Sequence, residues 1–297
     1  MSNETIANPH WSSRSATMNL IQAIKTSSWA GGFKTVSCSR GGCSRWLTQR
    51  HLETGKVGVY LRGSWYCSYR CFTSAAEEVF AQMLGGGNHI SSSRHNSRMP
   101  LGLNMVSKGL LNDAQYREVN EESKQSGEEI GDVVVRRGFA DEKQVTAIRA
   151  AQWACPVYTA PSRALATHVQ IPPTLTKLYT MVPLRQTAAT KTLMMGFVQG
   201  VEYSPLYAVE QITGYKAQPC FVTPTDYWNQ VEAQREANNA DELIFDSMQT
   251  PEEMTKVVCN YGALLNAAEI SIVRCREFLW ARAKGGKRTA DMLFRAS

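Results

Sequence analysis

The sequence lacks several features that would assign it to common classes of protein. Its 297 residues contain no uninterrupted apolar run of about 18 residues, so we expect no transmembrane helix and no membrane insertion. Residues 1–26 mix Ser, Asn and Thr with scattered apolar residues, and they lack the apolar core of a secretory signal. These absences together predict a cytoplasmic protein.

Signatures of common catalytic sites are also absent. The phosphate-binding pattern G-x-x-x-x-G-K-[ST] does not occur, and the nearest stretch has Arg288 where Ser or Thr is needed. There is no HExxH or GxSxG pattern, and residues 151–200 contain no Asp or Glu that could serve as an acid or base. We therefore expect a protein that is not an enzyme.

Acidic residues are scarce in the first third of the chain. Residues 1–100 carry eleven Lys and Arg against four acids, a charge of +7, and the remaining residues carry −1 of the total of +6. A basic segment joined to a near-neutral remainder indicates units with different partners. Basic segments often contact nucleic acid, and they also occur as ordinary solvated surface.

The eight cysteines divide in the same way. The first four form two close pairs, C-x4-C and C-x3-C, which are Cys38, Cys43, Cys67 and Cys71. The other four are isolated, which is typical of small buried side chains. Four thiolates in two short-range pairs meet the requirement of a tetrahedral structural Zn²⁺ site. In a segment this short, zinc also replaces a core too small to fold alone.

The residues around the cysteines predict the local fold. Alternating apolar residues at 57–60 suit a hairpin between the two pairs, and Cys71 opens a helical pattern over 72–84. A knuckle, a hairpin and a ligand at the start of a helix make a treble-clef arrangement. The segment WYCSYRCF at 65–72 resembles the YCS-x-x-C signature of TRASH, MYM and FCS-type zinc fingers. That resemblance implies a zinc-binding module at 33–84.

An internal repeat with an offset of 29 residues follows the cysteine segment. The two copies are Leu101–Val119 and Ile130–Ile148. Each copy has a glycine where a short helix is expected to stop, and then a polar residue, Asn112 or Asp141, to cap a second helix. Each copy is therefore predicted to be a helix–turn–helix unit that buries its apolar face on the other.

The predicted fold class is α+β. It consists of a small treble-clef zinc finger, then a helical tandem repeat with a small α/β layer, then a C-terminal helix plus β-hairpin. Strands are expected at 192–199 and 218–223, helices at 204–213 and 225–236, a capped helix from Thr250, and a hairpin that pairs 270–280 with 291–295. The expected boundaries are a disordered tail at 1–32, the zinc finger at 33–84, a Gly/Ser linker at 85–98, the middle unit at 99–231 and the C-terminal unit at 241–297.

The repeat also carries a family resemblance. Its pattern L-G-x-x-x-V-x-x-G-x-x-x-x-x-Q is similar to the N-terminal (MshEN or GspE-N) domain of type II secretion and type IV pilus assembly ATPases, over about residues 99–231. The resemblance implies a module that docks a protein partner, such as a secretion, pilus or signalling component. The missing phosphate-binding loop predicts that the chain lacks ATPase activity.

Some members of that family bind cyclic di-GMP through the two repeats. The resemblance would place Leu101, Gly102, Ile130, Gly131 and Gln152 in the binding groove. The family's repeats begin with Arg, whereas this sequence has Pro100 and Glu129 at those positions. Because a cyclic dinucleotide carries two phosphates, these departures predict weak binding, and they favour repeats that serve as a helical scaffold.

Two functions from different classes fit the sequence. The first is a non-enzymatic cytoplasmic regulator or adaptor that combines the zinc finger with the docking module. The alternative is a nucleic-acid-binding regulator that acts through residues 33–84. There Arg40, Arg45, Arg50, Arg62 and Arg70 would contact phosphates, and Trp46, Trp65 and Tyr69 would stack on bases.

Overall fold

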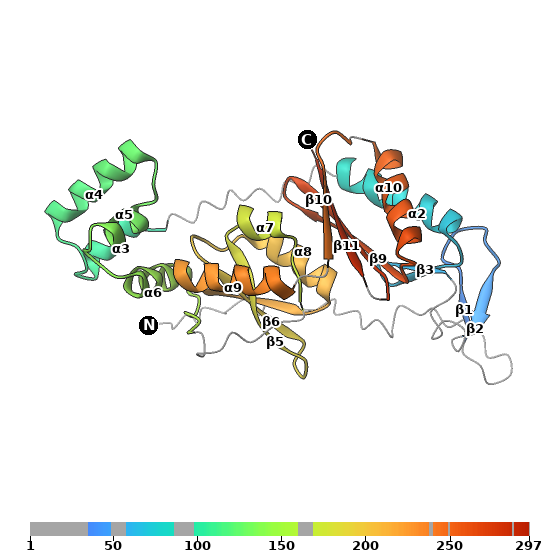
Figure 1. Cartoon of the computed structure of the whole chain (residues 1–297), viewed down its shortest axis with the longest axis horizontal. Helices are drawn as coiled ribbons and strands as arrows, with labels where there is room; N and C mark the ends of the chain where they lie inside the picture. The colour runs from blue at the N-terminus through green and yellow to red at the C-terminus, as the bar shows by residue number, and fades with distance from the viewer. Residues whose placement is uncertain are drawn as a thin grey trace, which may run out of the picture.

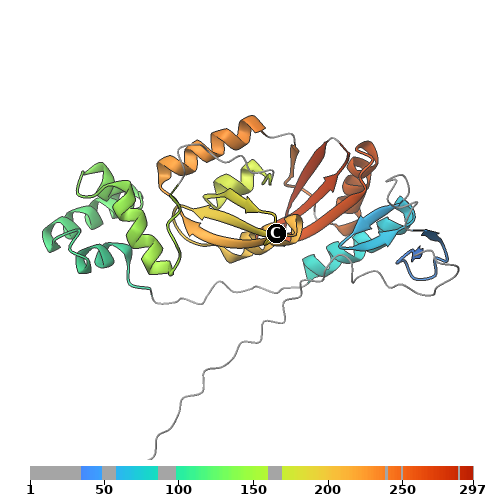
Figure 2. The same cartoon turned by 90° about the horizontal axis from the view of Figure 1, so that it is seen from below.

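The computed structural model describes residues 35–48, 58–85, 98–159, 169–237, 240–248, 250–286 and 288–296. The described residues form an α+β fold with its parts in a row (Figures 1 and 2). A helical unit lies at one end, a three-stranded sheet in the middle, and a six-stranded sheet with the cysteine segment at the other end. The predicted fold class is confirmed. The tail expected at 1–32 and most of the linker expected at 85–98 lie outside the described residues.

The cysteine segment folds as two short hairpins followed by a helix. β1 (Thr35–Ser37) pairs with β2 (Trp46–Thr48), and β3 (Val59–Leu61) pairs with β4 (Ser64–Tyr66), both antiparallel. α2 (Tyr69–Gly85) follows directly. We call these five elements the finger. Their order is the one that the cysteine spacing predicts.

Four helices make up residues 98–153, which we call the repeat unit: α3 (Leu101–Ser107), α4 (Asp113–Ser126), α5 (Ile130–Arg136) and α6 (Glu142–Trp153). Asn112 and Asp141 cap α4 and α6, and in each cap the side chain accepts a hydrogen bond from the amide of a glutamine three residues on. Gly109 and Gly138 follow α3 and α5 with φ of +72° and +71°, a conformation that glycine adopts without steric cost. The predicted caps and helix ends are confirmed.

The middle of the molecule is a three-stranded sheet of β5 (Met181–Thr187), β6 (Thr192–Phe197) and β7 (Lys216–Phe221). α8 (Tyr203–Thr213) crosses from β6 to the parallel β7, and α7 (Pro173–Leu178) precedes β5. α9 (Pro224–Ala237) packs along β5. The strands and helices predicted at 192–236 are confirmed within a few residues. β5 was not predicted.

The six-stranded sheet has the order β4-β3-β9-β10-β11-β8. The strands from the C-terminal part are β8 (Ala240–Phe245), β9 (Glu269–Cys275), β10 (Phe278–Lys284) and β11 (Thr289–Arg295). The hairpin predicted about Gly285 and Gly286 forms between β10 and β11. The single strand expected at 270–280 is wrong, because Arg276, at φ +52°, turns the chain and splits the segment into β9 and β10.

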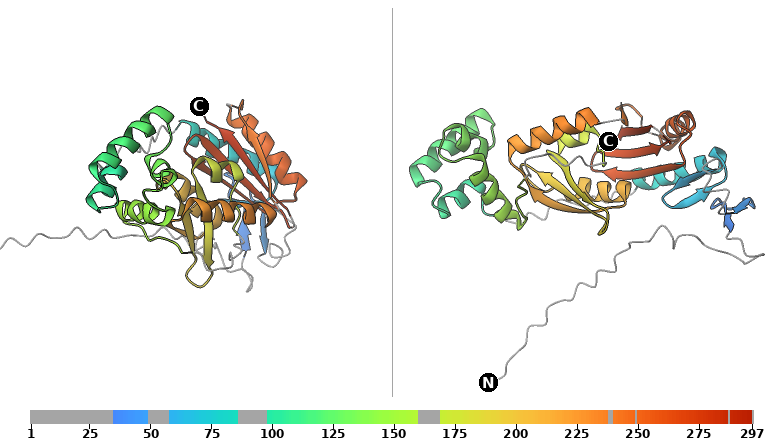
Figure 3. Two further views of the ribbon diagram at one scale, coloured as in Figure 1. Left: turned by 60° about the vertical axis from the view of Figure 1, so that its left-hand side comes forward. Right: turned by 60° about the horizontal axis from the view of Figure 1, so that its bottom comes forward.

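The finger is built into this sheet. β3 lies parallel to β9, with Leu61 opposite Ile270, and α2 packs beside α10 (Pro251–Leu264) (Figure 3). Along β9, Ile270 and Ile272 belong to the core under α2 and α10, whereas Val273 and Cys275 belong to a core shared with α8 and the middle sheet. The segments expected at 33–84, 99–231 and 241–297 therefore share cores across the boundaries drawn between them.

The repeat unit has its own core, formed by Leu101, Met105, Leu111, Val119, Val133, Val134, Ala140 and Val145. α6 is the helix of this unit that packs against β7. Within the described residues, no helix combines the length and the apolar composition that a membrane span requires.

Candidate metal centre and repeat unit

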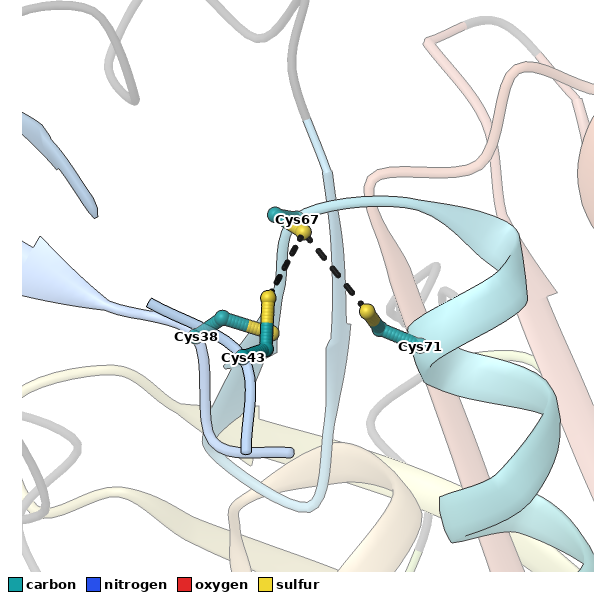
Figure 4. A group of neighbouring side chains, drawn as sticks. All are labelled: Cys38, Cys43, Cys67 and Cys71. Atoms are coloured by element: carbon teal, nitrogen blue, oxygen red, sulfur yellow. Dashed lines mark hydrogen bonds between the residues drawn. The ribbon is translucent and has the colours of Figure 1, made fainter. Parts of the chain in front are cut away.

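Four cysteine side chains of the finger meet at one point (Figure 4). Cys38 and Cys43 lie in the loop between β1 and β2, Cys67 follows β4, and Cys71 lies in the first turn of α2. Their four Sγ atoms all lie within 4.8 Å of one another. The structure thus brings together all four residues that the sequence predicts as metal ligands, and the cluster is compatible with a zinc finger.

The sulfur-to-sulfur distances test whether a single metal ion fits. The Sγ atom of Cys67 lies 3.7 Å from that of Cys43 and 3.7 Å from that of Cys71. A zinc ion bonded tetrahedrally to sulfur at about 2.3 Å separates neighbouring sulfurs by about 3.8 Å. All four are free thiols and form no disulfide. The donor atoms and their spacing therefore fit one tetrahedral divalent ion.

Local backbone contacts hold the four thiols in place. The amide of Cys43 donates to the carbonyl of Arg40 at 3.1 Å, and the amide of Cys38 donates to the carbonyl of Arg45 at 2.9 Å. Gly42, at φ +78°, allows the tight turn between them. At the start of α2, the amide of Cys71 donates to the hydroxyl of Ser68 at 3.4 Å.

Two of the thiols differ in acidity. Burial and the neighbouring thiols raise the pKa of Cys67 to about 12. Burial also acts to raise the pKa of Cys71, but hydrogen bonds with Ser68, Cys67 and Arg40 outweigh it and lower the pKa to about 7. Because its pKa is lower, Cys71 is the more readily ionised of the two. The thiolate that it forms is the species that binds a metal.

A hollow of about 410 Å³ lies beside the cluster and is lined by Cys43, Cys67 and Cys71. Its lining includes Arg40, Arg45, Arg70 and Ser68 beside the cysteines. No Asp or Glu of the described chain lines the hollow, and none of the three guanidinium groups forms an ion pair with a described carboxylate. The immediate surroundings of the cysteines are therefore strongly basic.

The structure corrects the set of aromatic residues expected to stack on bases. Trp65 is 2% exposed and packs in the core of the finger, so the stacking role predicted for it is wrong. The hydroxyl of Tyr69 is buried beside α10. Trp46 is 63% exposed. Arg62 lies in the β3–β4 turn, away from the hollow, and Arg50 lies outside the described residues.

Two of the four isolated cysteines are the small buried side chains that the sequence suggests. Cys220 and Cys275 are fully buried, and burial raises the pKa of each to about 12. Both thiols are therefore protonated near neutral pH. Cys155 and Cys259 are half-buried.

The repeat glycines lie where two helices approach closely. A Cβ atom on Gly102 would lie 2.6 Å from the Ile130 side chain and 2.6 Å from the ring of Tyr116. A Cβ atom on Gly131 would lie 2.7 Å from a guanidinium nitrogen of Arg149. Leu101 is buried in the core of the repeat unit, and Ile130 packs against that core. Helix packing therefore accounts for these four residues of the expected groove.

The remaining polar groups near the expected groove have partners within the chain. The amide of Gln152 donates to the carbonyl of Met99, and the guanidinium of Arg98 lies 3.5 Å from the centre of the Trp153 ring. Arg149 forms an ion pair with Glu129. The sequence did not indicate the role of Arg149, because a lone arginine in a helical pattern is usually on the surface.

Comparisons with known proteins add little beyond this geometry. No protein-family model matches the chain, and no curated protein matches it. Eight chains of solved structures are similar to it. One of them, described as "Structure of MshE with cdg", is 19% identical, with an alignment that covers 46% of this chain and 99% of that chain at a TM-score of 0.37. A likeness at that score assigns neither a fold nor a ligand.

Proposed function

We propose that this chain is a non-enzymatic regulatory or adaptor protein. Its finger is held together by one structural zinc ion, and its repeat unit docks a protein partner. The observation that carries the proposal is the set of four sulfurs within 4.8 Å of one another, with 3.7 Å separations typical of a tetrahedral site.

The ligand set supports a structural role for the metal. Cys38, Cys43, Cys67 and Cys71 supply four protein ligands, whereas catalytic zinc sites keep one position open for water or substrate. The bound ion would join the β1–β2 loop to the start of α2. Because β3 pairs with β9, the same ion would stabilise one end of the six-stranded sheet.

The position of the repeat unit supports a docking role. This unit lies at the end of the molecule opposite the finger and has a core of its own (Figure 2). Met99 and Leu103, beside and within α3, are 52% and 42% exposed, which leaves apolar surface beyond the packed helices. A protein partner that covers this surface would remove apolar area from water.

In this proposal the repeats bind cyclic di-GMP with low affinity or not at all. The two positions where the resembled family has arginine hold Pro100 and Glu129, and Glu129 is paired with Arg149. Helix packing occupies the space above Gly102 and Gly131. These contacts support the scaffold interpretation of the repeat.

Nucleic-acid binding is the second candidate. Arg40, Arg45 and Arg70 around the hollow favour it, together with the exposed Trp46. Binding that depends on phosphate contacts would weaken steeply as salt is raised.

Site-specific crosslinking in an extract of the source cells tests the docking role. Tagged wild-type protein is compared with a Met99→Glu, Leu103→Glu variant and with a Leu264→Glu control, which changes a residue that is 71% exposed on α10. We expect a partner that crosslinks to wild type and to the control but is lost with the repeat variant. If the wild-type protein, the repeat variant and the control crosslinked the same partners to the same extent, docking through the repeat unit would be contradicted.

A further inference from the structure

We propose that Arg40, Arg45 and Arg70 form a guanidinium shell that offsets the negative charge of the metal-loaded cysteines, with Arg40 as its positioning residue. The inference rests on the proposed metal site. It gives three of the five arginines that the sequence groups as phosphate contacts a different partner, the metal-loaded cysteines. It also accounts for the basic hollow without a separate ligand.

The charge of the loaded site explains why such a shell is needed. Four thiolates and one divalent ion carry a combined charge of −2. Cys38, Cys67 and Cys71 are each less than a tenth exposed, so water screens that charge poorly. The three arginines that line the same hollow supply +3, and no described carboxylate opposes them. The shell therefore compensates the charge of the site and leaves an excess of about one positive charge.

Arg40 contacts one ligand directly and lies beside another. Its carbonyl accepts a hydrogen bond from the amide of Cys43 at 3.1 Å, and its side chain lines the hollow together with Cys71. It therefore lies between the β1–β2 loop and the first turn of α2. Arg45 contributes its carbonyl to the amide of Cys38, while its exposed side chain, like that of Arg70, acts through space.

The shell has a consequence for nucleic acid. Most of the positive charge around the hollow is matched by the loaded site, so it is not free to neutralise a row of phosphates. Trp46 is exposed but does not line the hollow, so its ring is not part of the basic surface that the three arginines form.

Competition with a chromogenic zinc chelator tests the shell on the full-length, zinc-loaded protein. The variants are Arg40→Ala, Arg40→Lys and the double variant Arg45→Ala, Arg70→Ala. Arg62→Ala is the matched control, because Arg62 is an exposed arginine of the finger that does not line the hollow. Groups that contact metal ligands typically alter metal affinity about 10–100-fold when removed. We expect that loss for Arg40→Ala, a smaller loss for Arg40→Lys and for the double variant, and none for Arg62→Ala.

Two further measurements distinguish this proposal from misfolding of the variants and from a role of the arginines in nucleic-acid binding. The sulfur-to-metal absorption band of the cobalt-substituted protein reports whether Arg40→Ala still forms a four-sulfur site, so that weak affinity is not confused with misfolding. Fluorescence anisotropy with a single-stranded RNA 12-mer measures nucleic-acid binding by the same variants.

Unchanged zinc affinity in Arg40→Ala would contradict the proposal of a guanidinium shell. So would a tenfold loss of RNA affinity in the arginine variants with zinc affinity intact, because the arginines would then serve nucleic acid. A wild-type protein that binds no metal would instead contradict the proposed function itself.

Discussion

Arg149 of α6 forms an ion pair with Glu129, the residue that precedes α5, and it also donates to the carbonyl of Val198 at 2.7 Å. The side chain of Arg149 is 3% exposed and that of Glu129 is 32% exposed. One arginine thus joins the second copy of the repeat to the loop after β6. Gly131 leaves the space that the guanidinium occupies. This contact helps to attach the repeat unit to the middle sheet, beside the packing of α6 against β7.

Glu129→Gln is predicted to loosen that attachment. The substitution leaves a buried guanidinium without its carboxylate, which costs about 2–3 kcal/mol. Hydrogen exchange should show the loss as weaker protection of α5 and α6. Arg136→Ala serves as the control, because Arg136 makes its ion pairs on the surface, where solvent screens them and they contribute little to stability. Equal effects of the two variants would show that the Arg149 pair does not anchor the unit.

Alanine at the repeat glycines is predicted to destabilise the repeat unit. Overpacking at Gly102 or Gly131 costs about 1–3 kcal/mol, and the better helix propensity of alanine returns about 1 kcal/mol. Gly85→Ala, at the end of α2 with no atom near the added Cβ, should cause no loss. Thermal unfolding of the three variants measures the difference. If Gly131→Ala matched Gly85→Ala, the close approach of the helices would not explain the repeat glycines.

Calorimetry on the full-length chain is predicted to show no saturable cyclic di-GMP binding below about 100 μM. Each missing arginine–phosphate bond forfeits about 1.5–3 kcal/mol, and two such bonds are missing. The sequence alone suggests that arginine at both positions 100 and 129 would improve binding. The structure restricts this to Pro100→Arg, because Glu129 is needed by Arg149. Tight binding by the wild-type chain would mean that another cation, such as Arg98, leaves its stacking contact to hold a phosphate.

Asp291→Asn is predicted to weaken the six-stranded sheet. The buried carboxylate of Asp291 accepts hydrogen bonds from Trp280 Nε1 at 2.7 Å and from Arg282 Nε at 2.6 Å. Removing its charge leaves the buried Arg282 uncompensated, which costs about 3–5 kcal/mol. Asp241→Asn is the matched control, since Asp241 pairs with Arg288 on the surface and should cost about 1 kcal/mol or less. The midpoints of urea unfolding decide whether the two differ as expected.

The sequence predicts the local features of this molecule well. Asn112 and Asp141 cap their helices and Gly109 and Gly138 end theirs, because caps and left-handed turns depend on residues close together in the chain. The four-cysteine cluster follows from spacing in the same way.

The local sequence patterns did not predict the long-range contacts. The pairing of Leu61 with Ile270 joins strands more than two hundred residues apart, and nothing in either segment specifies the other. Arg276 turns the chain without the glycine that usually marks such a turn. The burial of Arg149 depends on Val198 and Glu129, which lie in other elements. Tertiary packing decided all three.

The metal content of the purified protein, together with what unfolds when the metal is lost, tests the proposed function most directly. Elemental analysis under reducing conditions should find one zinc per chain in wild type and none in Cys67→Ser. Hydrogen exchange of that variant should lose protection in the finger and in α10, which packs on α2, while the repeat unit keeps its protection. A wild-type protein with substantially less than one equivalent of zinc, or a Cys67→Ser variant with undiminished protection in α2 and β3, would contradict a structural metal site in the finger.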